Sequence, residues 1–548
     1  MAGISDIFNI ARSGIRANQQ GLATTSHNIA NINTKGYSRQ EVVLETARPA
    51  EGTIGSGVRV AAIRQTVDDF LENQLTSVNE DIGSITARNN YLVQADGIFT
   101  ETDNSGLSFS LTEFFNAVRD LATNPESTIQ RTVLLAKGQS LSDQFVTVAQ
   151  GLNQIRLDAD GEIARHVDTI NGLATKIASL NDVIFKTESG GRDALDLRDQ
   201  RRVLINDLAG LVNIEQVPLN DGITINVGGQ LLVAGNHANA LSTEADPDNP
   251  PLHDVTFVRS DGSELSITHN IHGGQIGGLL VQRDEDMVEF QDQVDRLAAV
   301  LINEFNQQHQ AGYGLDGTTN NNFFSTLSPQ APLAHDRNSG SATGSSVTIA
   351  DPTLATFQEY EVQFSGASAY SVVNTATGAT VTSGAYTSGS SLSFDGLDVV
   401  INGTPAAGDV FYVNAQKGAA QQFGVALSDT DKIAAASTAA GIPGNNTNAL
   451  NLVAIHTNRH VDLGNVTLND YHTITIGDVG SATQQSTQAL HSKQLEIDQL
   501  TALRESVSGV SLDEELTNLL SFQRSFEASA RMITVADELF QTILAMGR

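Results

Sequence analysis

The chain has 548 residues, no cysteine, and 63 acidic against 31 basic side chains, which gives a formal net charge of −32 at pH 7. This charge repels phosphate backbones and anionic lipids, so the composition argues against nucleic acid and membranes as partners. Without cysteine the chain has neither disulfides nor thiolate chemistry. Its length predicts about three or four domains, at roughly 150 residues each.

The N-terminal segment predicts an amphipathic helix over residues 1–33, because its apolar side chains recur at steps of three and four. Its stripe holds Ile4, Phe8, Ile15, Leu22 and Ile29. Asp6, Arg12 and Arg16 interrupt any uncharged core of the kind that a cleavable signal peptide needs. We therefore expect no Sec export, and any export would follow a route that does not cleave a signal. The sequence contains no apolar run of about 18 residues, so it does not predict a membrane-spanning helix.

A break follows this first helix. Gly36 can take the left-handed conformation that ends a helix, and Tyr37 offers an aromatic anchor beyond it. Residues 38–64 alternate in polarity and predict extended structure. Coiled-coil spacing then predicts long helices over 67–99 and 141–184. Globular helices average about 11 residues, so these lengths indicate an elongated helical rod.

The second half of the chain alternates between strand and helix patterns. A period of two predicts a small β subdomain at about 213–275, and apolar helical spacing returns at 278–305. Residues 338–424 are rich in Gly, Ser and Thr and predict an inserted all-β module, either a sandwich or a barrel. Helical pattern resumes near Ala449 and continues from Ser481 toward the C-terminal end.

The C-terminal end repeats the pattern of the first helix over residues 512–544. Its stripe includes Leu516, Leu519, Phe526, Ile533, Phe540 and Leu544. Two stripes almost 500 positions apart each need a partner, so we predict that they pair with each other or with neighbouring copies. Such pairing implies nested domains, whereas a row of sequential domains with two unrelated tails is the alternative.

The predicted fold class is mainly α with β insertions: an elongated multidomain chain with paired terminal coiled-coil helices, a long helical rod domain and an inserted all-β module. The predicted domains are the N-terminal part of the terminal helical domain with a linker (1–64), the helical rod domain (65–337), the all-β insert (338–424), the return segment of the rod (425–505) and the C-terminal part of the terminal helical domain (506–548).

No catalytic constellation stands out, and neither a Walker A nor an HExxH motif occurs. His456 and His460 have a spacing that could hold a metal, but they lack an acidic or thiol ligand nearby, which favours a solvated helix face. The glycines of GGQIGG at 273–278 are interpreted as a strand-to-helix junction. The acidic and arginine residues of 188–202 are interpreted as helical ion pairs. We expect no enzyme activity, no cofactor and no metal.

Two terminal strings carry a family resemblance. SHNIANINTKGY at 26–37 resembles the N-terminal signature of flagellar rod, hook and hook-associated axial proteins, with Asn28, Asn31, Gly36 and Tyr37 at matching positions. The string SGVSLDEELTNLLSFQRSFEASARMITVADELFQTIL at 508–544 resembles their closing signature. DALDLRDQRRVLINDLAGLV at 193–212 and the block at 277–317 narrow the resemblance to the hook-associated proteins of the hook-filament junction.

This resemblance implies a structural axial protein of the bacterial flagellum that is secreted by type III export and acts in motility. It implies an extracellular location and helical self-assembly through the terminal helices. The implied partners are copies of the chain itself, the flagellar hook protein, the second hook-associated protein (FlgL) and an export chaperone. Another flagellar axial protein, or an exported adhesin with flagellar-type ends, is the alternative. The expected assembly interface consists of Ile4, Phe8, Ile15, Leu22, Asn28, Ile29, Asn31, Gly36, Tyr37, Leu516, Leu519, Phe526, Ile533, Phe540 and Leu544.

Overall fold

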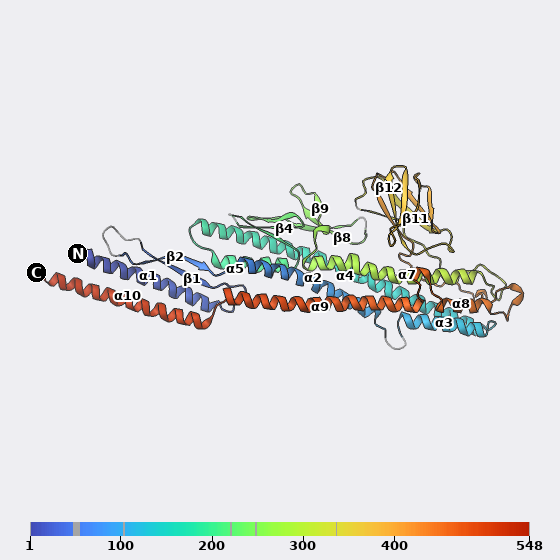
Figure 1. The fold of residues 1–548 in the computed structure, drawn as a ribbon, viewed down its shortest axis with the longest axis horizontal. Coiled ribbons are helices and arrows are strands. Elements are labelled where there is room, and N and C mark those ends of the chain that lie inside the picture. The colour runs from blue at the N-terminus through green and yellow to red at the C-terminus, as the bar shows by residue number, and fades with distance from the viewer. Residues whose placement is uncertain are drawn as a thin grey trace.

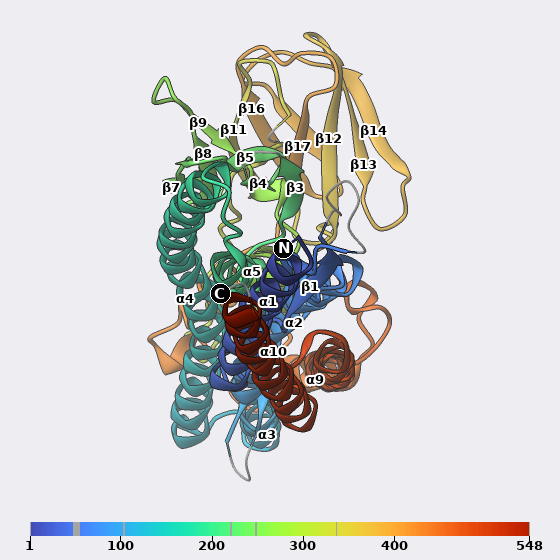
Figure 2. The same ribbon diagram turned by 90° about the vertical axis from the view of Figure 1, so that its left-hand side faces the viewer.

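The computed structural model describes residues 2–47, 55–101, 105–219, 222–246, 249–335 and 337–546. The molecule is long and narrow, and its two chain ends lie side by side at one tip (Figures 1 and 2). Helices dominate, as the sequence predicts. They are α1 (Ala2–Ala30), α2 (Asp69–Phe99), α3 (Leu107–Thr123), α4 (Thr128–Ser189), α5 (Leu195–Ala209), α6 (Gly274–Val281), α7 (Met287–Gln310), α8 (Thr447–Thr457), α9 (Leu468–Ser508) and α10 (Leu512–Met546).

Helices α2 to α9 form the rod, in which the 62-residue α4 is the longest element. α4 begins where the Ser127 side chain accepts a hydrogen bond from the Gln130 N–H, which satisfies one of the free donors of the first turn. Its apolar residues recur along one face, and Leu141, Phe145 and Leu152 are fully buried. α2 packs against α6 and α9, while α3 packs against α4 and α8. The rod therefore has a continuous core of its own.

Glycines let the rod helices cross closely. A Cβ atom on Gly278 would lie 2.0 Å from the Ser84 carbonyl oxygen, and one on Gly83 would lie 2.2 Å from the Gly210 carbonyl oxygen. Only glycine fits at such backbone contacts. The interpretation of GGQIGG as a strand-to-helix junction is thus incomplete, because Gly278 also makes the α2–α6 crossing possible.

A π-helical segment, Gln282–Asp286, joins α6 to α7. It carries charged residues of the block at 277–317 that resembles the hook-associated proteins. The Arg88 guanidinium contacts both carboxylate oxygens of Asp286 at 2.7 Å. Arg283 is 1% exposed and donates to Asp160 at 2.6 Å. Buried charges persist when they are paired in this way. The charged residues therefore hold the segment to α2 and α4.

The strands form five antiparallel sheets within the described residues. β1 (Gln40–Thr46) pairs with β2 (Val58–Gln65) beside α1. The small β subdomain contains two sheets, ordered β3-β4-β5-β6 and β7-β8-β9. Its strands are β3 (Glu215–Leu219), β4 (Gly222–Val227), β5 (Gln230–Ala234), β6 (His237–Ala238), β7 (Leu241–Ala245), β8 (His253–Val258) and β9 (Glu264–Ser266).

The insert is a sandwich of two sheets, ordered β10-β17-β12-β13-β14 and β11-β16-β15. Tyr360 of the first sheet meets Phe394 of the second, with ring centroids 5.1 Å apart. Its strands span residues 333–414, whereas the boundary expected from the sequence is 338–424. They are β10 (Leu333–Ala334), β11 (Thr343–Ile349), β12 (Glu359–Gly366), β13 (Ala369–Asn374), β14 (Thr380–Ala385), β15 (Ser391–Phe394), β16 (Leu397–Asn402) and β17 (Val410–Asn414).

The segment after β17 belongs to the rod core. Phe423 stacks on Phe145 of α4, with ring centroids 4.6 Å apart. The Asp295 carboxylate on α7 accepts the N–H groups of Gly418 and Ala420 at 2.7 and 2.8 Å. The chain then returns through α8 and α9 to the tip, so the predicted fold class and its paired terminal helices are confirmed.

Candidate assembly surface

Helices α1 and α10 lie antiparallel at the tip (Figures 1 and 2). Small residues set their spacing: a Cβ atom on Gly14 would lie 2.8 Å from Ser529 Oγ, and one on Gly21 would lie 2.6 Å from the Phe522 ring. These two contacts are seven residues apart on each helix, which is the period of a coiled coil. The stripe of large apolar residues did not point to Gly14 and Gly21.

The apolar residues expected at the interface divide into two groups. Phe8, Ile15, Leu22, Ile29, Leu519, Phe526 and Ile533 are half-buried in the helix pair. Leu516, Phe540 and Leu544 remain 45%, 42% and 58% exposed. The side chain of Ile4 lies outside the described residues. One antiparallel pair therefore covers only part of the predicted stripes.

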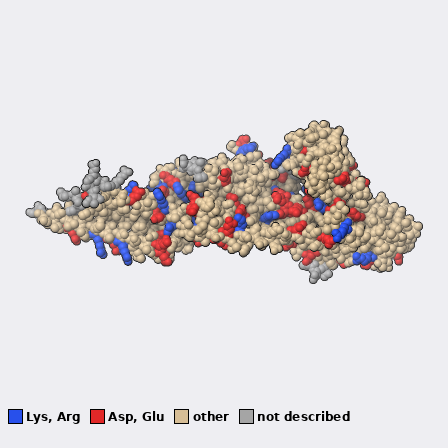
Figure 3. All heavy atoms as spheres, viewed as in Figure 1, with Lys and Arg blue, Asp and Glu red and all other residues tan. Residues whose placement is uncertain are grey.

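A second apolar row on α10, which we call the outer stripe, stays exposed beside the residues that pack on α1. Its members follow each other at steps of three or four residues, which places them on one face of the helix. They are Met532 (41% exposed), Val535 (54%), Leu539 (46%) and Ile543 (48%). On the face shown in Figure 3, the end of the tip also carries few charged side chains. An exposed apolar row of this kind is typical of a protein–protein contact.

Asn28 and Tyr37 of the N-terminal signature are buried where α1 meets the rod. We call this region, residues 28–40, the joint. The side-chain oxygen Oδ1 of Asn28 accepts hydrogen bonds from the Tyr37 hydroxyl at 2.8 Å and from the Gln40 N–H at 3.1 Å. The Asn28 amide donates to the Gln40 carbonyl at 2.9 Å. Asn31 donates to the His27 carbonyl at 3.0 Å, in the last turn of α1. Burial raises the pKa of Tyr37, with a further contribution from nearby carboxylates. These residues fix the direction in which the chain leaves α1.

Gly36 combines two requirements that exclude other residues. Its φ of +77° lies in the left-handed region, as the sequence predicts. A Cβ atom there would also lie 2.3 Å from a methyl carbon of Val203 on α5. The Gly36 carbonyl accepts a hydrogen bond from the Arg504 guanidinium at 3.1 Å. The turn is therefore packed between α5 and α9.

Polar contacts fasten the joint to three further helices. The Ser38 N–H donates to the Asp199 carboxylate of α5 at 3.0 Å. Arg39 pairs with Glu514 of α10 at 2.8 Å, and its N–H donates to the Ser508 carbonyl at the end of α9. Burial raises the pKa of Asp199, and Arg202 opposes this shift. Tip and rod are thereby held in one orientation.

Sequence reasoning missed the rod residues of this joint. Asp199 and Arg504 lie far from Gly36 along the chain, so no local pattern links them. The charged string at 188–202 is the signal that could have pointed to them, although its spacing indicates only ion pairs within a helix. Arg202 does pair with Asp199 in that way, but the same carboxylate also anchors Ser38.

The histidine pair is not a solvated helix face, which corrects the expectation from the sequence. His456 stacks on Phe115 with ring centroids 4.6 Å apart, and burial lowers its pKa. His460 lies beyond the end of α8, is buried, and contacts the Ile455 carbonyl at 3.0 Å. Among the described residues no group of three or more His, Cys, Asp or Glu is placed to hold a metal.

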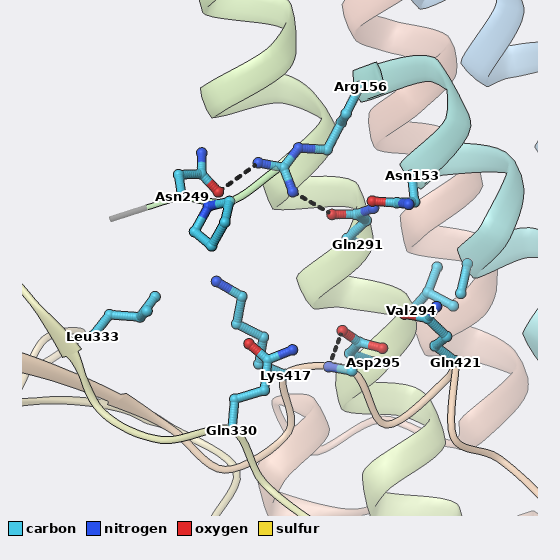
Figure 4. Close-up of a pocket in the computed structure, with 13 residues that line it drawn as sticks. Asn153, Arg156, Asn249, Gln291, Val294, Asp295, Gln330, Leu333, Lys417 and Gln421 are labelled. Carbon is cyan, nitrogen blue, oxygen red and sulfur yellow. Dashed lines mark hydrogen bonds between the residues drawn. The ribbon is translucent and has the colours of Figure 1, made fainter. Parts of the chain in front are cut away.

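Figure 4 shows a polar cavity of about 250 Å³ between α4, α7 and the segment after β17. Arg156 donates to Gln291 and Asn249 at its upper edge, and Lys417 lies opposite. Burial lowers the pKa of Lys417. Among the described residues that line this cavity, none carries a hydroxyl, thiol or imidazole group. Within the residues that the structure describes, no helix is both long and apolar enough to span a membrane.

Models of flagellar protein families match four parts of the chain. A model described as the flagellar hook-associated protein FlgK helical domain matches residues 92–324, and one described as a flagellar hook-associated protein 1 D2-like domain matches 333–415. A flagella basal body rod protein model matches 8–37, and a flagellar basal body rod FlgEFG protein C-terminal model matches 504–546. The last two matches cover the tip.

Full-length relatives carry the same family description. The chain is 31% identical to flagellar hook-associated protein 1 of Escherichia coli (strain K12), over 99% of this chain and 100% of that protein. It is 27% identical to flagellar hook-associated protein 1 of Bacillus subtilis (strain 168), over 97% and 96%. The solved flagellar hook junction protein FlgK from Burkholderia pseudomallei has a similar fold, with a TM-score of 0.70 and 22% identity over 80% of this chain and all of that one.

Proposed function

This chain belongs to the flagellar hook-associated protein 1 family, and from that membership we propose that it is a structural subunit of the hook-filament junction which assembles through its terminal helices. The observation that supports this role best is the incomplete packing of the tip. α1 covers one face of α10, while the outer stripe stays exposed. Burying each large side chain of that stripe would stabilise an assembly by about 1.5 to 3 kcal/mol.

A second copy can cover the outer stripe with its own outer stripe or with a different surface, and we propose a different surface, because contact between two like stripes would close after two copies. Contacts between unlike surfaces form a ring when the rotation between copies closes and an open helical layer when it does not, and the proposal is the open helical layer. The signature residues Asn28, Gly36 and Tyr37 serve this layer indirectly in our proposal. They hold the tip at a fixed orientation to the rod, so that identical copies repeat the same contact.

The proposed arrangement assigns a role to each predicted domain. Residues 1–64 and 506–548 form the inner layer of the junction, the rod surrounds it, and the insert, whose strands span 333–414, lies outermost. The proposed partners are copies of the chain, the hook protein on one side and FlgL on the other. An export chaperone would bind before secretion through the flagellar type III route, and the assembled protein would be extracellular. None of these roles requires catalysis.

A strain in which this gene is deleted tests the proposal. Electron microscopy should show hooks without filaments, and the wild-type gene should restore filaments. The variant Phe526→Asp should be exported but should not restore them, because each subunit would carry a charge at the α1–α10 seam. The neighbouring Glu527 is exposed, so Glu527→Gln is the matched control and should behave as wild type. Filaments of normal length on the deletion strain, or with Phe526→Asp, would overturn the proposal.

A further inference from the structure

Arg201 of α5 has a free hydrogen-bonding edge inside the base of the rod. The residue is 9% exposed, and its Nη1 donates to the side-chain oxygen Oδ1 of Asn181 at 2.7 Å. Its Nε is buried without an acceptor, and among the described residues neither Nε nor Nη2 has a partner and no carboxylate pairs with this guanidinium. A buried cation without an anion is costly, because the charge has lost its water.

Other arginines of the rod close the same edge with a carboxylate. Nε and Nη2 of Arg88 contact the two oxygens of Asp286 at 2.7 Å each. The same two atoms of Arg198 contact Glu188 at 2.8 and 2.9 Å. Two parallel N–H bonds match the two oxygens of a carboxylate. In Arg201 the same two atoms, the fork of the guanidinium, have no acceptor among the described residues.

Arg201 lines a cleft of about 590 Å³ bordered by α2, α5, β2 and the first strands of the small β subdomain. Four arginines line the cleft: Arg64, Arg198, Arg201 and Arg202. Nη1 of Arg202 is also buried without a hydrogen-bond acceptor. Of the acidic residues that line the cleft, Glu72 is already bonded to Arg504 at 2.8 Å, and Asp69 and Asp193 are exposed. The cleft therefore offers donors for an anion.

Arg201 remains a cation at neutral pH despite its burial. Burial lowers the pKa of Arg201 to about 10, and the charge of Arg198 acts in the same direction. The Glu188 carboxylate opposes this shift, and the charge of Arg202 adds to it. An anion bound at the fork would oppose both effects, because an opposite charge favours the charged form.

We propose that this cleft binds a carboxylate group through Nε and Nη2 of Arg201, and that in the assembled state the carboxylate is an acidic side chain of a second copy of this chain. With 63 acidic residues against 31 basic ones, every neighbouring copy presents many carboxylates. The cleft lies beside β2, next to the joint, so an occupied cleft would link one copy to the rod of another. The second-copy source rests on the proposed self-assembly, whereas carboxylate binding does not.

The binding step is tested on the full-length monomer with sodium acetate as the probe, at an ionic strength kept constant with sodium chloride. We expect a saturable rise of the thermal unfolding midpoint, because a ligand that binds only the folded state stabilises it. Arg201→Lys keeps the charge but loses the fork, and should weaken acetate binding at least tenfold. Arg64→Gln, at an exposed position of the cleft, should weaken acetate binding severalfold. This variant replaces Arg201→Lys in the test if Arg201→Lys does not fold. Arg259→Lys in the exposed β8–β9 turn is the control and should bind acetate as the wild type does.

The source of the carboxylate is tested by polymerisation of the same proteins, followed by light scattering and electron microscopy. If a second copy supplies the group, acetate should slow wild-type polymerisation and Arg201→Lys should polymerise more slowly than Arg259→Lys. Acetate binding with unchanged polymerisation would overturn the second-copy source and leave a free small carboxylate as the ligand. No acetate-dependent shift in the wild type would overturn the site itself. A wild-type chain that does not polymerise at all would contradict the proposed function, and the acetate titration would still decide the site.

Discussion

The rod and the tip are both built from long amphipathic helices, but they differ in how much of their apolar surface one chain can bury. Along α4 a buried residue recurs at nearly every turn from Arg131 to Ile184. Along α10 only Glu515 and Ala536 are buried, although the helix has 35 residues. The rod completes its core within one chain, whereas the tip needs further helices. Similar sequence patterns can therefore specify a finished domain or an unfinished interface.

The stability of the two regions should differ accordingly. An isolated helix pair with one narrow contact face is marginal in water, because most helical stability in proteins comes from tertiary packing. The joint adds polar contacts at the base of the tip but covers none of the outer stripe. We therefore expect the tip helices to open readily in the monomer and the rod to remain folded. The predictions below test this contrast.

The largest effect is expected from removing an aromatic ring in the rod core. Phe145 is fully buried and stacks on Phe423, so Phe145→Ala should lower the free energy of unfolding by about 3 to 5 kcal/mol. Urea unfolding of the monomer measures this change. Phe526→Ala at the tip is the matched substitution and should change monomer unfolding by less than about 1 kcal/mol. Equal losses for both variants would mean that the tip is as well packed as the rod.

Acid should weaken the rod through a buried histidine. His309 is fully buried, with Nδ1 2.7 Å from the Asn321 carbonyl oxygen and Nε2 accepting the Ala434 N–H, so the ring must be neutral. Burial lowers its pKa to about 4, below the 6.5 of an unfolded histidine. The stabilisation is therefore complete above pH 6.5 and is lost as the pH falls toward 4.

His309→Gln can keep one donor and one acceptor without titrating, so its unfolding free energy should depend less on pH over this interval. The expected difference in slope is at most about 1.4 kcal/mol per pH unit, and urea unfolding between pH 7 and pH 4.5 measures it. Parallel pH profiles for the two proteins would exclude His309 as a source of acid sensitivity.

A smaller effect is expected where glycine allows α1 and α10 to approach. Gly21→Ala places a Cβ atom 2.6 Å from the Phe522 ring, and such overpacking costs about 1 to 3 kcal/mol in each assembled subunit. Polymerisation followed by light scattering should slow, while urea unfolding of the rod stays unchanged. Gly97→Ala in α2 meets open space and is the control; it should stabilise the rod by about 1 kcal/mol. If Gly21→Ala polymerised normally, the close approach of α1 and α10 at this position would not be needed for assembly.

The smallest effect should come from removing the sandwich. Leu333 pairs with Tyr412 across β10 and β17, so a short Gly/Ser linker can replace residues 333–414. We expect urea unfolding and polymerisation close to those of the wild type. A cut at 341–419 should be more harmful, because it removes Gly418, whose N–H binds the buried Asp295 carboxylate. Failure to polymerise after the 333–414 replacement would show that the insert makes an essential contact.

Periodicity made much of this architecture predictable. Apolar steps of three and four indicated α1, α2, α4 and α10, and alternating patterns indicated the two β regions. The pairing of α1 with α10 followed from the need of each stripe for a partner. α3 was not among the predicted elements, although Leu111, Phe115 and Val118 carry the same period. Its 17 residues lie between two much longer helices.

The contacts between distant segments were not predictable from local patterns. Gly14 fits against Ser529 because glycine has no side chain, and the spacing of apolar residues gives no sign of such a contact. The hydrogen bond from the Ser38 N–H to the Asp199 carboxylate joins residues that are far apart in the chain. Likewise, nothing in the sequence distinguishes Arg201, whose fork is free, from Arg198, whose fork is closed. Such features arise when tertiary packing brings the segments together.

Amide hydrogen exchange on the full-length protein, before and after polymerisation, tests the contrast between rod and tip most directly. In the dilute monomer we predict slow exchange for the core residues of α4 and fast exchange for α1 and α10, since local opening follows local packing. After polymerisation, α1 and α10 should become protected to a degree that approaches α4. Strong protection of both tip helices in the dilute monomer, unchanged on polymerisation, would contradict the claim that one chain leaves this interface unfinished.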